Sequence, residues 1–295
     1  MSLPDKHSLA FTGHGLDRAD HVRADPVRLT AALRDDAARQ LRLDGLIPLL
    51  DTDDHLQWDR FNADDGAERV FLGLRDGAPI FVAVPSGGDP DPSYARAETW
   101  KALGRLGHSE LAQFGGARSM ADWHARHRFC PHCGGGTVLA KGGWQRECVM
   151  CGGQHFPRFD PVAIMLVEHD DRILLGRNTR FPQRQYSALA GFVEPGESLE
   201  EGVAREILEE AGVKVRDVTY VASQPWPFPN QLMLGCHSHA DDDALVIDRT
   251  ELEDAHWFTR AEIENALAAG DKAEAFIAPP PRTIAHFLMK WWLGR

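Results

Sequence analysis

The sequence predicts a mixed α/β (α+β) protein whose main domain is a mixed sheet between helical layers. After residue 158, β-type apolar runs and amphipathic helical patterns are interspersed, and several runs follow one another without a helix between them. Between residues 127 and 157 the composition shifts to cysteine, glycine and polar residues, which cannot form an apolar core. These observations divide the chain into an N-terminal α/β domain (1–125), a cysteine-rich segment (126–157) and a C-terminal α/β/α sandwich (158–295).

Composition narrows the class of protein. The chain has 295 residues, is 43% hydrophobic and 26% charged, and carries 32 basic against 44 acidic side chains, a net charge of −12. These values are typical of a globular protein. No apolar stretch approaches the ~18 residues of a membrane span, and the N-terminus lacks a basic, apolar leader, so we expect no membrane contact and a cytoplasmic location. The acidic balance argues against a broad nucleic-acid-binding surface.

The N-terminal domain carries no chemical motif, and we expect it to serve as a partner-packing or dimerisation domain. Asp25-Pro26 is typical of a helix start, and the spacing of Leu29, Leu33 and Ala37 predicts a helix to about Leu41. Strands are predicted over 45–50, 69–74 and 79–84, the last two joined by a hairpin at Asp76-Gly77, and a further helix over 94–114.

The C-terminal domain has more regular patterns. Strands are predicted over 162–167, 173–176, 188–193, 215–223 and 232–238, and helices over 199–211, 261–269 and 283–293.

Four of the five cysteines form two C-x2-C pairs separated by 14 residues: Cys130, Cys133, Cys148 and Cys151. Zn²⁺ favours four soft thiolates, and a closed four-sulfur site leaves no position for water. The spacing therefore predicts one structural Zn²⁺. Two disulfides or a redox pair are the alternatives, which an intracellular chain disfavours.

Histidines near cysteines raise two weaker candidates. His132 lies between the zinc ligands, where an exposed loop position is favoured over a ligand role. Cys236, His237 and His239 suggest a second metal site, but adjacent strand residues point to opposite faces, which favours a structural interpretation.

The stretch from Gly191 to Val213 contains an acidic helix. Ser198 and Glu201 match a capping box, and Gly212 is placed to end the helix in a left-handed conformation, so a helix is predicted over 199–211. The predicted apolar arc consists of Val203, Ala204, Ile207, Leu208 and Ala211.

Glu206 and Glu210 lie four residues apart at the border of this arc, with Glu209 just beyond. Crowded carboxylates repel one another unless cations neutralise them, which favours an Mg²⁺ or Mn²⁺ site. Arg205 can pair with Glu209 and hold the array. A solvated acidic helix face is the alternative.

Over these 23 residues the nine defined positions resemble the signature of the Nudix hydrolases, so the stretch from Gly191 to Val213 is called the box below. The resemblance implies metal-dependent hydrolysis of a nucleoside diphosphate derivative, with Arg205 in the catalytic signature and Glu206, Glu209 and Glu210 holding the ions. Glu210 is the first candidate for a combined ligand and base role.

A proline-rich run, Ser223 to Pro229, follows the box. Prolines at alternate positions hold the preceding residues extended, so Gln224, Trp226 and Phe228 would be presented rigidly, the two aromatics suited to stacking. A polyproline ligand or a packed strand end is the alternative. With the cysteine pairs, the run resembles the NADH pyrophosphatase family, whose hallmark has the form SQPWPFPxS; Gln231 replaces the final serine.

This resemblance implies cleavage of NAD(H) into nicotinamide mononucleotide and AMP, commonly by a homodimer. It also implies Glu251 as a metal ligand outside the box, and substrate contacts from Gln224, Trp226, Phe228, Pro229, Gln231, Phe156, Ala190 and Ala285. Core packing of Phe156 and simple exposure of Glu251 are alternatives. Other functions kept open are ADP-ribose or damaged nucleoside triphosphate hydrolysis, NAD-cap removal from RNA, and an NAD-sensing module without activity.

Overall fold

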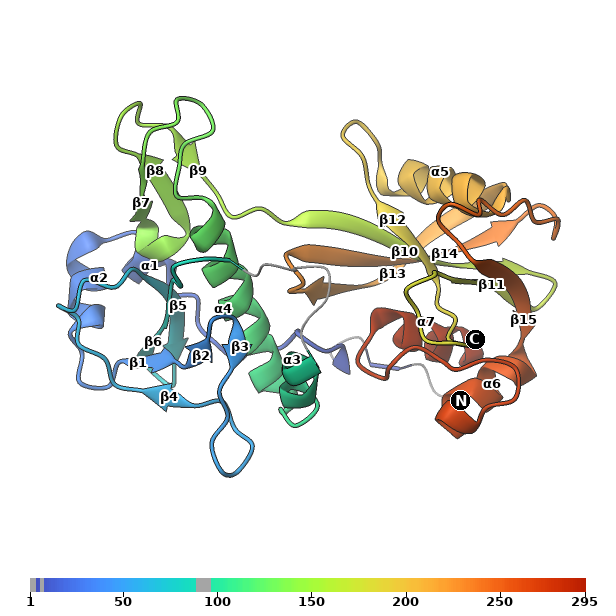
Figure 1. The fold of residues 1–295 in the computed structure, drawn as a ribbon, viewed down its shortest axis with the longest axis horizontal. Coiled ribbons are helices and arrows are strands. Elements are labelled where there is room, and N and C mark those ends of the chain that lie inside the picture. The colour runs from blue at the N-terminus through green and yellow to red at the C-terminus, as the bar shows by residue number, and fades with distance from the viewer. Residues whose placement is uncertain (1–3, 6–7, 89–96) are drawn as a thin grey trace. The chain divides into compact units, whose positions relative to one another are not determined.

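The computed structural model describes residues 4–5, 8–88 and 97–295. The chain forms two compact units (Figure 1). Unit 1 combines the described part of 1–10 with 160–225 and 231–295, and unit 2 consists of the described part of 11–159 with 226–230. No helix in the described ranges has both the length and the apolarity needed to cross a bilayer.

Unit 1 is built on a six-stranded mixed sheet of β10 (Asp160–His169), β11 (Arg172–Arg177), β12 (Leu189–Phe192), β13 (Val215–Trp226), β14 (Gln231–Ala240) and β15 (Asp254–Thr259). The strand order is β13-β14-β10-β11-β15, and β12 pairs with β10. The central strand β10 runs parallel to β14 and antiparallel to β11 and β12. The predicted mixed sheet is therefore confirmed.

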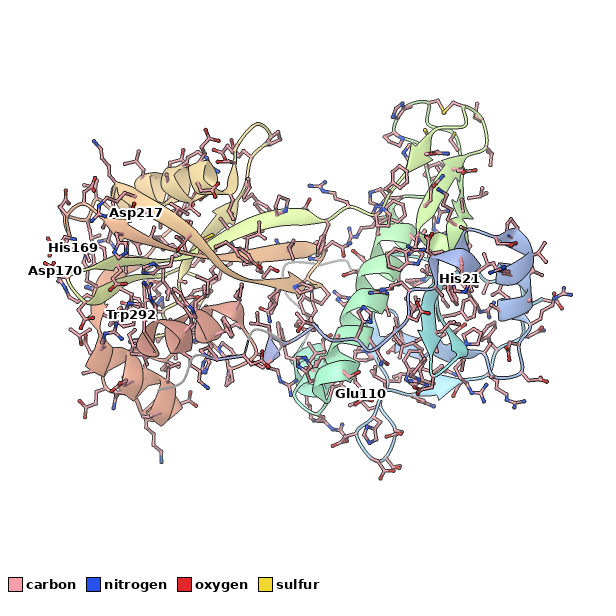
Figure 2. The ribbon with its side chains drawn as sticks, turned by 180° about the vertical axis from the view of Figure 1, so that it is seen from behind. His21, Glu110, His169, Asp170, Asp217 and Trp292 are labelled. Carbon is pink, nitrogen blue, oxygen red and sulfur yellow. The ribbon has the colours of Figure 1, made fainter. Side chains whose placement is uncertain are left out.

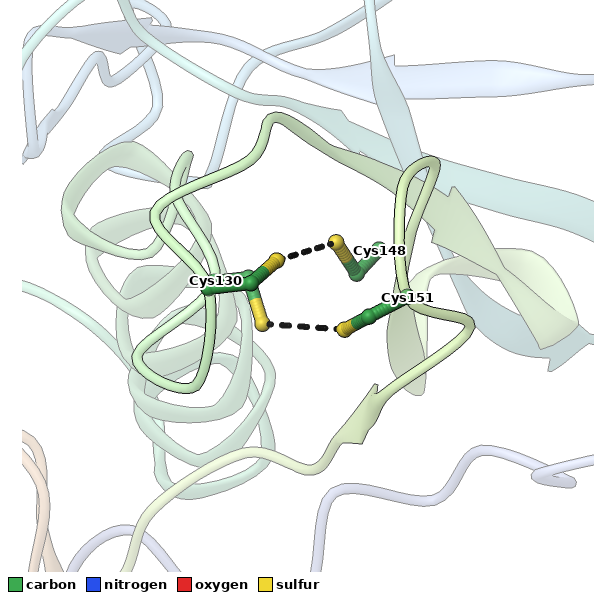
Figure 3. Close-up of side chains that lie close together, drawn as sticks. Cys130, Cys148 and Cys151 are labelled. Carbon is green, nitrogen blue, oxygen red and sulfur yellow. Dashed lines mark hydrogen bonds between the residues drawn. The ribbon is translucent and has the colours of Figure 1, made fainter.

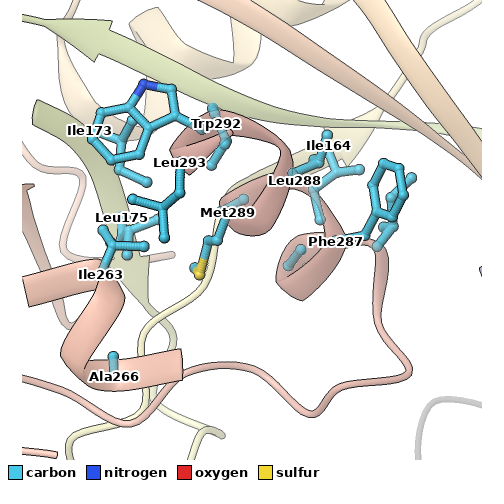
Figure 4. Close-up of a cluster of buried hydrophobic side chains, with 14 of the residues drawn as sticks. Ile164, Ile173, Leu175, Ile263, Ala266, Phe287, Leu288, Met289, Trp292 and Leu293 are labelled. Carbon is cyan, nitrogen blue, oxygen red and sulfur yellow. The ribbon is translucent and has the colours of Figure 1, made fainter. Parts of the chain in front are cut away.

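Helices cover both faces of this sheet (Figure 1): α5 (Leu199–Ala211) one face, α6 (Arg260–Ala269) and α7 (Ile284–Leu293) the other. Because strand residues alternate in direction, Met165 of β10 packs in the α5 core and its neighbour Leu166 in the α7 core. Figure 4 shows the second core, where Ile164 lies beside Leu288 of α7.

The strand predictions for unit 1 are confirmed, although β10, β13 and β14 extend beyond the predicted ranges. β10 and β11 are joined by a two-residue turn in which Asp170 (φ 46°) and Asp171 (φ 58°) are both left-handed, the geometry that suits the twist of a hairpin. Strand β15 was not predicted. It pairs with β11, and its sequence does not alternate regularly between apolar and polar residues, which is the pattern that predicts a strand.

Unit 2 contains α1 (Asp20–Arg23), α2 (Pro26–Leu33), β1 (Arg39–Leu41), β2 (Leu43–Asp44), β3 (Ile47–Pro48), β4 (Trp58–Asp59), β5 (Arg69–Arg75), β6 (Ala78–Ala83), α3 (Ala97–Leu103) and α4 (His108–Arg126). Its main sheet has the order β4-β1-β6-β5. The predicted hairpin is confirmed: β5 and β6 are antiparallel, and Asp76 and Gly77 both have positive φ.

Three predictions for this unit were wrong. The helix predicted to Leu41 ends at Leu33, because the Asp35 carboxylate accepts a 2.7 Å hydrogen bond from the Ala37 N–H in a turn, after which β1 pairs with β6. The strand predicted over 45–50 is reduced to β3. The helix predicted over 94–114 is divided into α3 and α4 near Gly104 and Gly107, and its residues 94–96 lie outside the described part.

The cysteine-rich segment forms a three-stranded sheet of β7 (Thr137–Ala140), β8 (Gln145–Cys148) and β9 (Gln154–His155), with the short helix η2 (Lys141–Gly143) between the first two strands. Arg146 of β8 is fully buried and donates to Glu68 (3.1 Å) and to the Thr137 carbonyl (2.8 Å). A buried cation with these partners fixes β8 against the N-terminal part of unit 2.

Candidate active site and metal centres

Helix α5 has the boundaries that the sequence predicts. Ser198 and Glu201 form the capping box, and Gly212 is left-handed (φ 73°). The predicted apolar arc was wrong at one position: Leu208 is 48% exposed, while Glu210, on the other flank, is 6% exposed. The buried side of the helix is therefore rotated towards Glu210, so a carboxylate occupies part of its inner face.

Arg205 is the centre of a charge network on α5. Its guanidinium donates to both oxygens of Glu197 (2.6 and 3.0 Å), to Glu206 (2.8 Å), to Glu209 (3.1 Å) and to the Phe192 carbonyl (2.9 Å). The predicted pair with Glu209 is confirmed. The bonds from Arg205 lower the pKa of Glu197 to about 2 and raise the pKa of Arg205 itself. This role of Glu197 was missed, although its fixed place in the box was the available signal.

Glu206 lies directly against the backbone of Gly191 on β12. A Cβ atom at Gly191 would overlap the Glu206 carboxyl group, so the site requires glycine there. Burial raises the pKa of Glu206, an effect that its bond to Arg205 opposes. The first glycine of the box is thus needed for close approach of a site carboxylate.

Glu210 is the most perturbed group of the cluster. Its Oε2 atom is buried and accepts no hydrogen bond from the described part of the chain. Burial, and next the negative charges of Glu206 and Glu251, raise the pKa of Glu210 to about 8. A buried carboxylate oxygen without a donor is costly unless it gains a proton or a cation.

Backbone hydrogen bonds bring Glu251 close to this cluster. The N–H groups of Val246 and Asp248 donate to the carbonyls of Ala211 (2.8 Å) and Glu210 (2.9 Å), which ties the loop before β15 to the end of α5. The charge of Glu251 contributes to the raised pKa values of both Glu206 and Glu210. The charge of Glu209 also contributes to both shifts, so all four predicted ligands interact electrostatically.

These carboxylates fit hard divalent cations, which take oxygen ligands. The unpaired Oε2 of Glu210 supports this assignment, since a cation would satisfy it. Their ligand atoms are not gathered as tightly as those of a closed site: in the described ranges, no three of Glu206, Glu209, Glu210 and Glu251 have donor atoms within 4.8 Å of one another.

The four paired cysteines do form a compact cluster. Their sulfurs lie within 4.8 Å of one another, with 3.7 Å between Cys130 and Cys151 and 3.5 Å between Cys133 and Cys148 (Figure 3). All four are free thiols, so neither pair is a disulfide here. Backbone N–H groups of Cys151 and Met150 lower the pKa of Cys148 to about 6. This donor set fits a tetrahedral four-sulfur zinc site.

The proline-rich run is divided between two environments. In unit 1, Gln224 is fully buried and bonds the Ala10 carbonyl (3.1 Å), the Arg282 carbonyl (2.9 Å) and the Ile284 N–H (2.8 Å). In unit 2, Phe228 is 4% exposed beneath Arg118, and Trp226 is half-buried. Gln224 and Phe228 are therefore interior groups, whereas Trp226 is half-buried and its ring packs with the rings of Phe11, Trp100 and Phe228.

The remaining predicted contacts vary in exposure. In unit 1, Ala190 is exposed on β12, Gln231 is half-buried at the start of β14 and Ala285 is buried in α7. In unit 2, Pro229 is half-buried and the Phe156 side chain is 61% exposed.

Comparison with known proteins agrees with this architecture. Three family models match successive parts of the chain: the NADH pyrophosphatase-like rudimentary NUDIX domain (22–123), the NADH pyrophosphatase zinc ribbon domain (125–156) and the NUDIX domain (157–278). NAD-capped RNA hydrolase NudC of Mycobacterium bovis is 42% identical over 236 residues, which cover 76% of this chain and 75% of that protein. The chain belongs to the NADH pyrophosphatase family of Nudix hydrolases.

Other relatives are longer than this chain or match a smaller part of it. NAD-capped RNA hydrolase NUDT12 of Macaca fascicularis is 47% identical over 202 residues, and the human protein of that name is 46% identical over the same length. The match covers 65% of this NADH pyrophosphatase family member but 44% of each of those proteins. A crystal structure of a Nudix hydrolase from Nitrosomonas europaea has a TM-score of 0.45 and 24% identity, covering 56% of this chain and 90% of that one.

Proposed function

We propose that this protein hydrolyses the diphosphate bond of NAD(H) with the help of Mg²⁺ or Mn²⁺. The observation that carries the proposal is the buried, unpaired oxygen of Glu210 beside Glu206 and Glu251, within a complete box of the NADH pyrophosphatase family. Water adds to one phosphorus, the bridging P–O bond breaks, and nicotinamide mononucleotide and AMP leave.

The residues have separate tasks in this scheme. Glu206, Glu209, Glu210 and Glu251 would hold the divalent ions. The ions, when bound, neutralise the diphosphate and acidify the attacking water. Arg205 orients Glu206 and Glu209 through its two bonds. Glu210 has a pKa of about 8 without metal, so it would release its proton on binding an ion and could then serve as the base.

The test is an assay of the purified chain with NADH, with and without Mn²⁺, in which the products are separated by chromatography. We expect reduced nicotinamide mononucleotide and AMP in equal amounts, and no turnover with chelator. ADP-ribose and nucleoside triphosphates serve as competing substrates. Turnover of ADP-ribose without NADH would reject the NAD(H) specificity. Tight NADH binding without any turnover would instead identify a sensing module.

Substrate recognition is a further part of the proposal. Of the aromatics in the proline-rich run, Trp226 is half-buried and Phe228 is buried, while Phe156 is exposed, so we propose Trp226 and Phe156 as stacking groups. The same proposal includes Pro229, Gln231, Ala190 and Ala285 as substrate contacts, together with Gln224 and Phe228. Trp226→Ala should raise KM for NADH, whereas Trp58→Ala, on a separate strand of unit 2, should leave it unchanged.

A second candidate function is removal of an NAD cap from RNA. It is favoured by the names of the relatives in Mycobacterium bovis and Macaca fascicularis, which are NAD-capped RNA hydrolases. RNA bearing a 5′ NAD should then release nicotinamide mononucleotide and keep a 5′ monophosphate. A kcat/KM for this RNA far below that for free NADH would contradict a role as a decapping enzyme.

The proposal also covers the structural metal, the domain roles, the assembly and the cellular location of the protein. We propose a structural Zn²⁺ in the 126–157 segment, a catalytic domain over 158–295, and a homodimer in which the 1–125 domain takes part. The exposed side chains of Phe129 (72%), Val149 (65%) and Met150 (74%) all lie in the 126–157 segment and support an association surface on that segment. The free thiols support a reducing, cytoplasmic location. Zinc analysis tests the metal, and sedimentation equilibrium tests the homodimer.

A further inference from the structure

A cluster of two histidines and a glutamate lies at one end of the unit 1 sheet, outside the site described above. Glu168 of β10 is directly opposite His239 of the parallel strand β14, and His237 is two residues earlier on the same face. Figure 2 labels His169, the residue after Glu168 and the last of β10. Glu168 therefore lies at the end of β10 that leads into the turn, five residues after Ala163, which pairs with Gly191 of β12.

The three side chains share the α7 face of the sheet. On β10, Ile164 and Leu166 belong to the α7 core, and Glu168 continues this alternation. His237 contacts Trp291 of α7, with 5.5 Å between ring centroids. Cys236 points to the α5 core instead. Adjacent strand residues point to opposite faces, so Cys236 and His237 do not share a metal site, as the sequence predicts. His237 and His239 are two residues apart and therefore share a face.

The geometry fits a metal site. One ligand atom from each of Glu168, His237 and His239 lies within 4.8 Å of the other two, and His237 Nε2 is 2.7 Å from Glu168 Oε2. His237 is 2% exposed, and burial lowers its pKa. A neutral imidazole is the form that binds metals.

We propose that Glu168, His237 and His239 form a second transition-metal site, for an ion of the Zn²⁺ or Co²⁺ class, that joins β10 to β14. Two imidazoles and one carboxylate are a common donor set for such ions and leave a further position for water. Imidazole nitrogen also discriminates against Mg²⁺, which separates this site from the carboxylates of α5.

One neighbouring charge opposes the cation. Arg295 Nη1 lies 3.2 Å from His237 Nδ1, and the guanidinium also stacks on Trp291. Arg295 is exposed, so solvent screens its effect. Its removal should therefore strengthen metal binding by up to about fivefold, a change that unfolding of the variant could not produce.

The test uses the full chain with Zn²⁺ already bound by the cysteines, titrated with Co²⁺ alone and followed by absorption and calorimetry. We expect one Co²⁺ with a nitrogen and oxygen ligand spectrum. His239→Ala should weaken its affinity by at least about tenfold, whereas His21→Ala, at an exposed histidine of unit 2 (Figure 2), should not. Circular dichroism checks that His239→Ala is folded.

Arg295→Gln should show the gain in affinity, and Glu210→Gln should retain the ion. Equal Co²⁺ affinity in the wild type and a folded His239→Ala variant would overturn the proposal. Loss of the ion in Glu210→Gln alone would also overturn it, because that result assigns the ion to the α5 carboxylates.

Discussion

The cysteine cluster of unit 2 and the carboxylate cluster of unit 1 are both fitted to metal ions, but they are organised differently. The four sulfurs lie within 4.8 Å of one another, on turns whose backbone N–H groups stabilise thiolate. The glutamates around Glu210 are less tightly gathered, and one of them has a buried oxygen without a donor.

The difference follows from the charge of the ligands. Without metal, the pKa of Cys148 is lowered to about 6 and that of Cys133 is raised to about 12, so the four sulfurs are not all charged and can lie close together. Carboxylates at the same separation repel, and the protein holds Glu206 and Glu209 with Arg205 while Glu210 responds by a raised pKa. The metal-free carboxylate cluster is therefore left with a buried oxygen that has no hydrogen-bond donor.

Removal of the structural zinc should have the largest effect. Zinc in small sites contributes on the order of 10 kcal/mol of binding free energy, which here stabilises a segment with few aliphatic residues. Cys148→Ser should lose one Zn²⁺ per chain and unfold the 126–157 segment, measured by metal analysis and proteolysis. Cys236→Ala, at a cysteine buried in the α5 core, should keep the zinc. Unchanged zinc content in Cys148→Ser would contradict the assignment.

Glu210→Gln should come next. It preserves the shape of the side chain but removes its charge, so kcat for NADH should fall by about 1000-fold or more, about 4 kcal/mol, with substrate binding largely kept. Glu200→Gln, on the exposed first turn of α5, is the matched control. A loss of less than about tenfold would assign the chemistry to another group.

Arg205→Lys should have an intermediate effect. A lysine ammonium cannot reproduce the five bonds that Arg205 makes to three carboxylates and a carbonyl, so Glu206 and Glu209 lose their orientation. We expect kcat to fall by about 10- to 100-fold, with a higher Mn²⁺ concentration needed for half-maximal activity. Wild-type Mn²⁺ dependence in this variant would show that the network is structural.

The last prediction concerns the stability of the metal-free chain, which the raised pKa of Glu210 should make dependent on pH. The pKa of Glu210 is raised to about 8 from an ordinary value of 4.5, so the folded metal-free chain binds its proton more tightly than the unfolded chain. Its contribution is fully present below pH ~4.5 and is lost as the pH rises through ~8. The rise in pKa from 4.5 to about 8, at about 1.4 kcal/mol per pH unit, sets an upper limit of about 5 kcal/mol on the fall in the free energy of unfolding over this range, relative to Glu210→Gln. Parallel urea curves for the two chains would contradict the raised pKa.

The sequence by itself determined the local features that depend on near neighbours. The capping box of Ser198 and Glu201, the turn at Asp76-Gly77, the pairing of Arg205 with Glu209 and the two cysteine pairs all follow from short spacings. Each is fixed by steric or ligand rules that act within a few residues, or by a metal donor set whose chemistry is independent of the fold.

The tertiary structure decided what depends on packing between distant segments. It buried Glu210 instead of Leu208, turned Gln224 into a bonded interior group, and placed Glu168 opposite His239 across two strands. It also converted the residues near Leu41 from helix to strand by pairing them with β6. Burial and strand pairing are set by long-range contacts, which a local pattern of residues does not contain.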